Sequence, residues 1–200
     1  MYVEMKNIVK KYGDFLASDH VSLGVEKGKL VALLGPSGSG KTTLIKLANG
    51  LLVPTAGELW INGRAPGKES HAMVSYLPER TSLPLWMTVK QLQDFYEDFY
   101  ADFQRERSEE MLDRLEISAK QRMKHMSKGT REKVQLILAM SRQAKLYLLD
   151  EPIGGVDPAA RDYILDTIIR NYNPEASVII STHLIADVEK VLDEVLFIDR

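Results

Sequence analysis

The stretch from Gly35 to Thr43 has the residue types and spacing of a phosphate-binding loop. It reads Gly35-Pro36-Ser37-Gly38-Ser39-Gly40-Lys41-Thr42-Thr43 and fits the P-loop pattern G-x-x-x-x-G-K-[ST]. The glycines let the backbone curl so that several N–H groups point at one centre, which suits an anion. Lys41 would reach the β- and γ-phosphate oxygens, and the Thr42 hydroxyl would bind Mg²⁺. The loop therefore predicts a site for a triphosphate.

Two adjacent acids, Asp150 and Glu151, end the apolar run 146–149. A carboxylate at the end of a strand can hold Mg²⁺ opposite a P-loop, usually through water. The second carboxylate can polarise the water that attacks the γ-phosphate. Adjacent strand residues point to opposite faces, so the two acids can take different roles. The alternative is a solvated acid pair without chemistry, which the presence of a P-loop disfavours.

His183 follows the apolar run 177–181 and Thr182. Ligands of open α/β sheets bind beyond the carboxyl ends of the strands, and an imidazole there could hydrogen-bond the γ-phosphate and sense its loss. A structural histidine is the alternative. The remaining histidines have no such support, and we expect structural roles for them: His20, His71 and His125.

Ser127 has the residue type and position of a helix N-cap. Its hydroxyl, Gly129 and the free N–H groups of a helix start could form a second anion site. The surrounding segment is basic and contains Lys120, Arg122, Lys124, Lys128, Arg131 and Lys133. Taken alone, these residues favour a capped helix with a solvated basic face.

Apolar patterns predict the elements that position these groups. A buried strand at 29–34 precedes the P-loop and a helix at 43–48 follows it, while buried strands at 145–149 and 177–181 carry the acids and His183. Further strands are expected at 2–9, 19–26, 58–63, 73–77 and 195–198, helices after Asp157 and over 183–192, and a polar loop over 64–72. Strands alternating with helices imply a mostly parallel sheet with helices on its faces.

From Val89 to Arg142 the apolar residues recur at helical spacing, which predicts a largely helical insertion over 85–140. Its first helix carries an aromatic stripe that we expect in the core, formed by Leu92, Phe95, Tyr96, Phe99 and Phe103.

The composition is typical of one soluble globular domain: 200 residues, 44% hydrophobic and 27% charged. A net charge of −2 gives no general reason to expect nucleic-acid binding. The absence of cysteine excludes disulfides, thiol catalysis and cysteine-bound zinc. No apolar stretch is long enough to span a bilayer, and the N-terminus lacks an apolar signal core. We therefore expect a cytoplasmic protein, and any membrane function needs a membrane partner.

Together, these motifs resemble the ATP-binding subunit of ABC transporters over essentially the whole chain. Beside the P-loop, the matching features in chain order are the aromatic Tyr12, the Q-loop region Tyr76-Leu77-Pro78-Glu79, the signature motif at Met126–Thr130, the Walker B strand Leu146–Asp150 with Glu151, the D-loop Gly155-Val156-Asp157 and the H-loop Ser181-Thr182-His183.

The resemblance implies an α/β fold with a P-loop NTPase core in 1–84 and 141–200, a mostly parallel sheet, a small N-terminal antiparallel β subdomain and a helical subdomain over 85–140. It further implies that two such domains pair head to tail, with ATP and Mg²⁺ between the P-loop of one and the signature motif of the other. Closure on ATP and opening after hydrolysis would drive membrane-spanning partners.

The resemblance also implies roles for single residues. Tyr12 would stack on adenine, and Asp157 would bridge the dimer interface. Ser127 and Gly129 would contact the γ-phosphate bound by the partner subunit. Glu151 would be the general base, with Lys41 and His183 holding the γ-phosphate. The expected metal ligands are Thr42, Glu79 and Asp150. The expected partners are a second copy or a paralogous ATPase subunit, and a polytopic membrane permease at the cytoplasmic face of the membrane.

Three features depart from the family pattern. Glu79 stands where the Q-loop has glutamine, which adds a negative charge beside the γ-phosphate. Lys128 replaces the first signature glycine and Thr130 the glutamine, and a lysine there resembles the ABC-2-type exporter branch. The chain ends at Arg200, where relatives usually continue, which indicates a compact or a shortened member.

Two other functions stay open at this point. One is a soluble ABC-type ATPase of DNA repair or translation, and the other is a nucleotide-dependent interaction module that hydrolyses ATP weakly. Trp86 and Met87 lie just after the Q-loop, where they could contact the membrane partner or pack locally.

Overall fold

A central parallel sheet carries the candidate site. The computed structural model describes residues 1–154, 158–173 and 175–199. Within them the five-stranded sheet has the order β5-β6-β7-β3-β8, and its pairings are parallel. Its strands are β3 (Leu30–Leu34), β5 (Val74–Leu77), β6 (Leu146–Asp150), β7 (Ser177–Thr182) and β8 (Glu194–Phe197). β3, β6 and β7 are buried throughout, as expected of strands covered on both faces.

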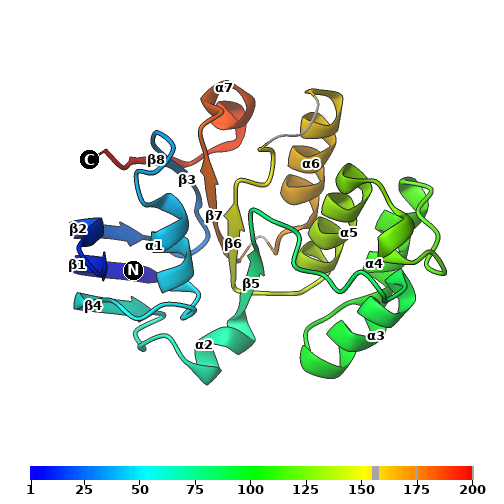
Figure 1. The fold of residues 1–200 in the computed structure, drawn as a ribbon, viewed down its shortest axis with the longest axis horizontal. Coiled ribbons are helices and arrows are strands. Elements are labelled where there is room, and N and C mark those ends of the chain that lie inside the picture. Colours follow the sequence, from blue (N-terminus) through cyan, green and yellow to red (C-terminus); the bar gives the residue numbers. More distant parts are fainter. Residues whose placement is uncertain (155–157, 174, 200) are drawn as a thin grey trace.

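Alternate residues of one strand serve two different cores. Leu146 and Leu148 of β6 pack into a cluster that includes the helix α1 (Lys41–Ala48), whereas Tyr147 and Leu149 pack into the cluster of the helical insertion. Figure 1 shows the resulting layers, with α1 on one face of the sheet and α5 (Lys128–Met140) and α6 (Pro158–Asn171) on the other. Because successive side chains of a strand point to opposite faces, β6 contacts the helix layers on both sides of the sheet.

A second, smaller sheet is formed by the N-terminal strands. β1 (Val3–Tyr12) lies between β2 (Phe15–Val25) and β4 (Ala56–Ile61), and both pairings are antiparallel. Gly13, at φ 57, lies in the turn between β1 and β2. β2 begins at Phe15, well before the strand expected from the alternation of apolar residues.

The sequence-based expectation of a loop over 64–72 is wrong in its second half. Residues Lys68–Met73 form the short helix α2. Its start is held by the buried Ser70, whose hydroxyl accepts a hydrogen bond from the Gly67 N–H at 2.8 Å and donates one to the Gly67 carbonyl at 2.9 Å. The expected helix over 183–192 is shorter and divided into α7 (Ile185–Val188) and the 3₁₀ turn η2 (Glu189–Val191).

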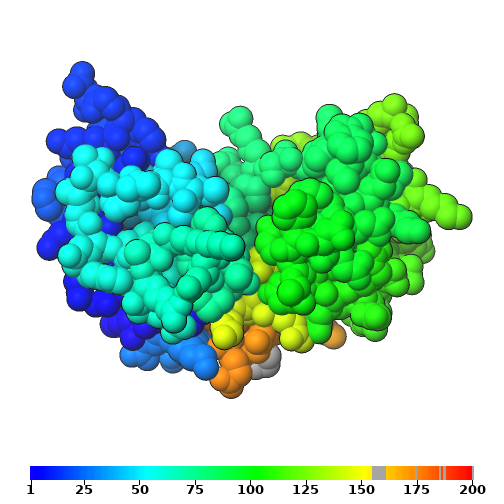
Figure 2. Space-filling view, turned by 90° about the horizontal axis from the view of Figure 1, so that it is seen from below, coloured from blue at the N-terminus to red at the C-terminus, as the bar shows by residue number. Residues whose placement is uncertain are grey.

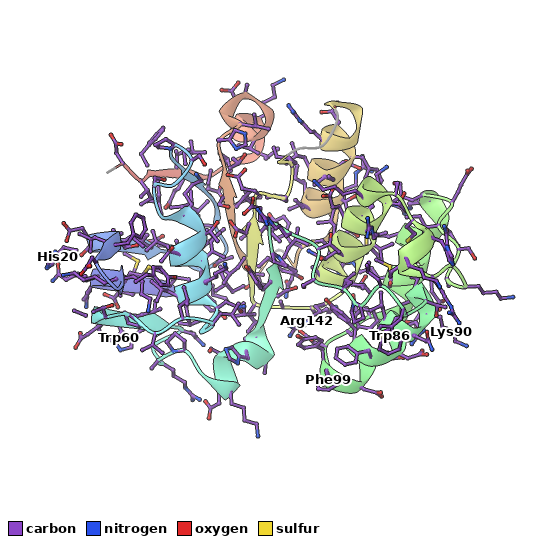
Figure 3. All side chains as sticks on the ribbon, viewed as in Figure 1. His20, Trp60, Trp86, Lys90, Phe99 and Arg142 are labelled. Carbon is purple, nitrogen blue, oxygen red and sulfur yellow. The ribbon has the colours of Figure 1, made fainter. Side chains whose placement is uncertain are left out.

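The helical insertion contains α3 (Val89–Phe99), α4 (Arg105–Arg114), the 3₁₀ turn η1 (Met123–His125) and α5. The expectation that its aromatic stripe is core is only half right. Leu92 and Phe103 are buried, but Phe95 and Phe99 are 45% and 68% exposed and stack on each other with ring centroids 4.4 Å apart. Trp86, labelled in Figure 3, is also exposed. Met87 packs against the core.

Arg142 joins the helical insertion to the amino ends of the strands (Figure 3). Its side chain is only 3% exposed and donates hydrogen bonds to the Ala72 and Val74 carbonyls and to the Asp102 carboxylate. The guanidinium also lies 3.8 Å from the centre of the Tyr100 ring. Seen from below, a blue-to-cyan lobe and a green lobe are separated by a hollow (Figure 2). Arg142 thus connects Ala72 and Val74 to Asp102 of the helical insertion through its side-chain hydrogen bonds.

Candidate functional site

The loop between β3 and α1 has the tight curl that its glycines predict. Gly38 and Gly40 have φ values of 80° and 98°, in the left-handed region where other residues are strained. A Cβ on Gly40 would lie 2.5 Å from the Ala17 carbonyl oxygen, and one on Gly35 would lie 2.3 Å from the Ile198 carbonyl oxygen. The loop therefore needs glycine for both its dihedral angles and its close packing.

The ammonium group of Lys41 lies inside this curl. Its Nζ donates to the carbonyl oxygens of Gly35 at 2.8 Å and of Pro36 at 3.1 Å, and it lies 3.8 Å from Glu151 Oε1. The side chain is 7% exposed. A positive charge is thus held at the start of α1, where the helix N-terminus also favours an anion.

Asp150 presents a buried carboxylate beside the P-loop. Its Oδ1 accepts hydrogen bonds from Thr42 Oγ1 at 3.0 Å and Ser181 Oγ at 2.7 Å, while its buried Oδ2 has no hydrogen-bond partner among the described residues. Burial raises the pKa of Asp150, and the Ser181 and Thr42 hydroxyls partly oppose this. A free carboxylate oxygen next to a hydroxyl fits a hard cation such as Mg²⁺.

Glu151 lies one residue beyond β6, in a left-handed conformation with φ 49°. Its N–H donates to the Ser181 carbonyl at 3.1 Å and lies 3.0 Å from the Ser181 hydroxyl. Its Oε2 lies 3.0 Å from His183 Nδ1, so the carboxylate bridges His183 and Lys41. The side chains of Asp150 and Glu151 have different partners. The cause is the backbone turn at Glu151, which lies beyond the end of β6, and not the expected alternation of side chains along a strand.

Lys41, Glu151 and His183 line one cavity of about 1080 Å³, whereas the buried Asp150 does not line it. Six of the nine expected P-loop residues line it, together with Glu79, Glu151 and His183, whereas Gly35, Pro36 and Ser39 do not. The lining also contains residues that the sequence did not single out for this place: Phe15, Ala17, Arg80, Thr81, Lys128, Arg131, Glu132 and Gly154. β6 and β7 lie side by side next to α1 in Figure 1, so the cavity lies at the carboxyl ends of the central strands. A site there follows the general rule for open α/β sheets.

Tyr12 does not line this cavity. Its ring is 46% exposed and lies 5.2 Å from Lys10 Nζ. Phe15, at the start of β2, lines the cavity instead, with 57% of its surface exposed. No local sequence signal marks Phe15, because the contact that brings its strand to the P-loop, the Ala17 carbonyl against Gly40, joins segments far apart in the chain.

Ser127 and Gly129 lie outside the cavity of their own chain. Ser127 caps α5, accepting a hydrogen bond from the Thr130 N–H at 3.1 Å, and its side chain is exposed. It lines a smaller hollow of about 260 Å³ on the other side of the helix start. A Cβ on Gly129 would meet no atom within 4 Å. Asp157, the expected interface residue, lies outside the described residues.

The sheet order, the P-loop cradle and the acids at the strand ends define a P-loop nucleotide-binding protein of the α/β class. A family model described as ABC transporter matches residues 18–154. The ABC transporter ATP-binding protein YxlF of Bacillus subtilis is 31% identical over 97% of this chain and 66% of the relative. The SkfA peptide export ATP-binding protein SkfE of the same organism is 29% identical over 98% of this chain and 84% of the relative.

A solved structure of an ATP-binding subunit of an ABC transporter superposes with a TM-score of 0.86 at 29% identity, covering 99% of this chain and 86% of that one. The chain belongs to the ABC transporter family, as an ATP-binding subunit. The resemblance and the fold class expected from the sequence are thereby confirmed. The chain spans 66% of the length of YxlF. None of the helices in the described part of the chain is both long and apolar enough to cross a membrane.

Proposed function

We propose that this chain binds ATP with Mg²⁺ and hydrolyses it to ADP and phosphate, as the ATPase subunit of an ABC exporter. The observation that carries the proposal is the carboxylate of Glu151, which lines the cavity and lies between His183 and the P-loop Lys41. An ionised carboxylate in this place can accept a proton from a water that attacks the γ-phosphate.

The other groups bind and orient. Lys41 and the P-loop N–H groups would hold the phosphates, and His183 would fix the Glu151 carboxylate through its 3.0 Å contact. Thr42, Asp150 and Glu79 would hold Mg²⁺, which when bound supplies positive charge to the phosphate oxygens. Phe15 would offer an apolar aromatic face to the adenine ring of ATP. All of these groups except the buried Asp150 belong to residues that line the cavity or to the P-loop.

The position of Ser127 and Gly129 outside the cavity of their own chain supports a dimer with two shared sites. In one chain these two residues do not line the cavity, although they belong to a helix start that favours phosphate. Head-to-tail pairing, as the resemblance implies, would bring them to the nucleotide of a second copy or of a paralogous subunit. Asp157 would lie at the same interface. We assign the two lobes accordingly, with the core in 1–84 and 141–200 and the signature subdomain in 85–140.

A membrane permease at the cytoplasmic face is the partner that fits this function. The peptide export named for SkfE and the lysine at position 128 favour export over import. The relatives' names favour this function over the DNA-repair or translation ATPases and over a weakly hydrolysing interaction module.

Replacing Glu151 with glutamine tests the proposal. Glu151→Gln keeps the shape of the side chain but removes the proton acceptor, so ATP hydrolysis should fall by about a hundredfold or more. ATP binding, measured by calorimetry, should remain. Phosphate release at the unaltered rate by the folded variant would contradict the role of Glu151.

A further inference from the structure

Gln135 is a buried glutamine in the middle of α5, and both ends of its amide hold the same loop. Its Nε2 donates to the Pro78 carbonyl at 3.2 Å, and its Oε1 accepts from the Ser82 N–H at 3.1 Å. The residue is 5% exposed. Its neighbours in α5 from Val134 to Met140 are otherwise buried and apolar, so a polar side chain is costly there unless its amide is bonded. The two bonds satisfy it.

The loop segment between these two bonds belongs to the nucleotide cavity. Glu79, Arg80 and Thr81, the three residues enclosed by Pro78 and Ser82, all line it. Residues 78–82, all of which are described, lie outside helices and strands. Their placement therefore depends on contacts such as those of Gln135. Gln135 touches the loop at both of its ends and leaves the middle free to face the cavity.

The same helix also reaches the second anion site. Ser127 caps its start, and Arg131, one turn before Gln135, lines the cavity that Glu79 also lines. A helix moves as a unit, so any displacement of the capped start also displaces Gln135 and the loop it holds. On the proposed function, that start meets the nucleotide of the partner subunit.

We infer that Gln135 is a positioning residue that couples the signature helix α5 to the Glu79 loop. The inference rests on the proposed function: engagement of Ser127 by the partner's nucleotide moves α5, and Gln135 carries this movement to Glu79 at the chain's own nucleotide. Glu79 is an expected Mg²⁺ ligand, so the apparent affinity for Mg²⁺ reports the position of the loop. The occupancy of one site then affects the metal at the other.

The test compares two buried glutamines. Gln135→Met keeps the length and the packing of the side chain, because methionine is unbranched and flexible. It removes both hydrogen bonds, because methionine has no amide group. Gln93→Met is the matched control: Gln93 is also fully buried in the insertion, but its Nε2 donates to Ser108 Oγ at 3.0 Å, away from the loop. Gln135→Glu is an intermediate variant that keeps an acceptor for the Ser82 N–H and loses the donor to Pro78.

In the full chain, the Mg²⁺ concentration that half-saturates ATP hydrolysis should rise about fivefold in Gln135→Met, the factor that one net hydrogen bond corresponds to. Hydrogen exchange of the Ser82 amide in the nucleotide-free protein should speed up by at least about the same factor. Gln93→Met should change neither value. In Gln135→Glu the Ser82 amide should stay protected while the Mg²⁺ requirement still rises.

A folded Gln135→Met chain with an unchanged Mg²⁺ requirement and unchanged Ser82 exchange would overturn the inference. If that variant does not fold, the unaltered chain decides, because a Ser82 amide that exchanges like an exposed one excludes the bond. If the unaltered chain hydrolyses no ATP, the proposed function fails by itself. In that case, slower exchange of the Ser82 amide on addition of ATP with Mg²⁺ still supports the coupling. Exchange that ATP with Mg²⁺ leaves unchanged contradicts it.

Discussion

Substitution of Gly129 by alanine should have opposite effects on the stability of the single chain and on ATP hydrolysis by the dimer. Gly129 lies in the first turn of α5, and a Cβ there meets no atom within 4 Å. Alanine is the better helix former by about 0.5–1 kcal/mol, so Gly129→Ala should raise the free energy of unfolding by about that amount. ATP binding by the P-loop of the same chain should not change, since Gly129 does not line that cavity.

ATP hydrolysis should nevertheless fall by about a hundredfold, as for the loss of one preorganised phosphate donor. The new methyl group would separate the start of α5 from the γ-phosphate of the partner's nucleotide. The matched control is Gly63→Ala, in a turn that does not line the cavity, with φ 75° and no atom within 4 Å of the added Cβ. Its left-handed strain should lower stability by about 1 kcal/mol and leave hydrolysis unchanged. Stability would be measured by urea unfolding and activity by phosphate release. A Gly129→Ala chain that is more stable and fully active would refute the shared-site reasoning.

Two further predictions concern stability and pH. Arg142→Met should lower the free energy of unfolding by about 3 kcal/mol, because it leaves Asp102 and the two carbonyls without their donor, whereas Arg114→Met at the exposed end of α4 should change it by less than about 0.5 kcal/mol in the same urea titration. Burial raises the pKa of Asp150, so its charge disfavours the folded, metal-free state at pH values above that pKa, and this cost disappears as the pH falls through the ordinary carboxyl range. Asp150→Asn should therefore gain more stability, relative to the unaltered chain, near about pH 7 than near about pH 3, while losing the stabilisation by Mg²⁺ and ATP. An equal difference at both pH values, measured by thermal unfolding, would contradict the buried charge.

The parts of the site that the sequence predicted are those with a local signal. The P-loop glycines, Asp150 at the end of an apolar run and His183 beyond another each follow from residue type and position within a few residues. Parallel pairing of the central strands then brings them together, because strands of one direction end at one edge. The covering of both faces was also predictable, since the unbroken apolar run of β6 is typical of a strand with helices on both sides.

The residues that were missed act over long sequence separations. Arg142 bonds the carbonyls of Ala72 and Val74, and Gln135 bonds a loop more than fifty residues earlier, as the 53- and 57-residue separations of its bonds show. No local pattern marks such contacts. Phe95 and Phe99 have the spacing of a core stripe, but the insertion leaves that face exposed. Periodicity predicts which residues share a face and does not predict whether another element covers it.

Mixing two inactive chains tests the shared site most directly. Lys41→Ala removes the P-loop charge and keeps the signature helix, whereas Gly129→Ala alters the signature helix and keeps the P-loop. In a head-to-tail pair of the two, one site combines the intact P-loop with the intact helix. The account predicts that the mixture recovers about one quarter of the unaltered specific activity, because about half of randomly formed dimers are mixed and each has one intact site. Phosphate release no higher than the average of the two separate chains would contradict it.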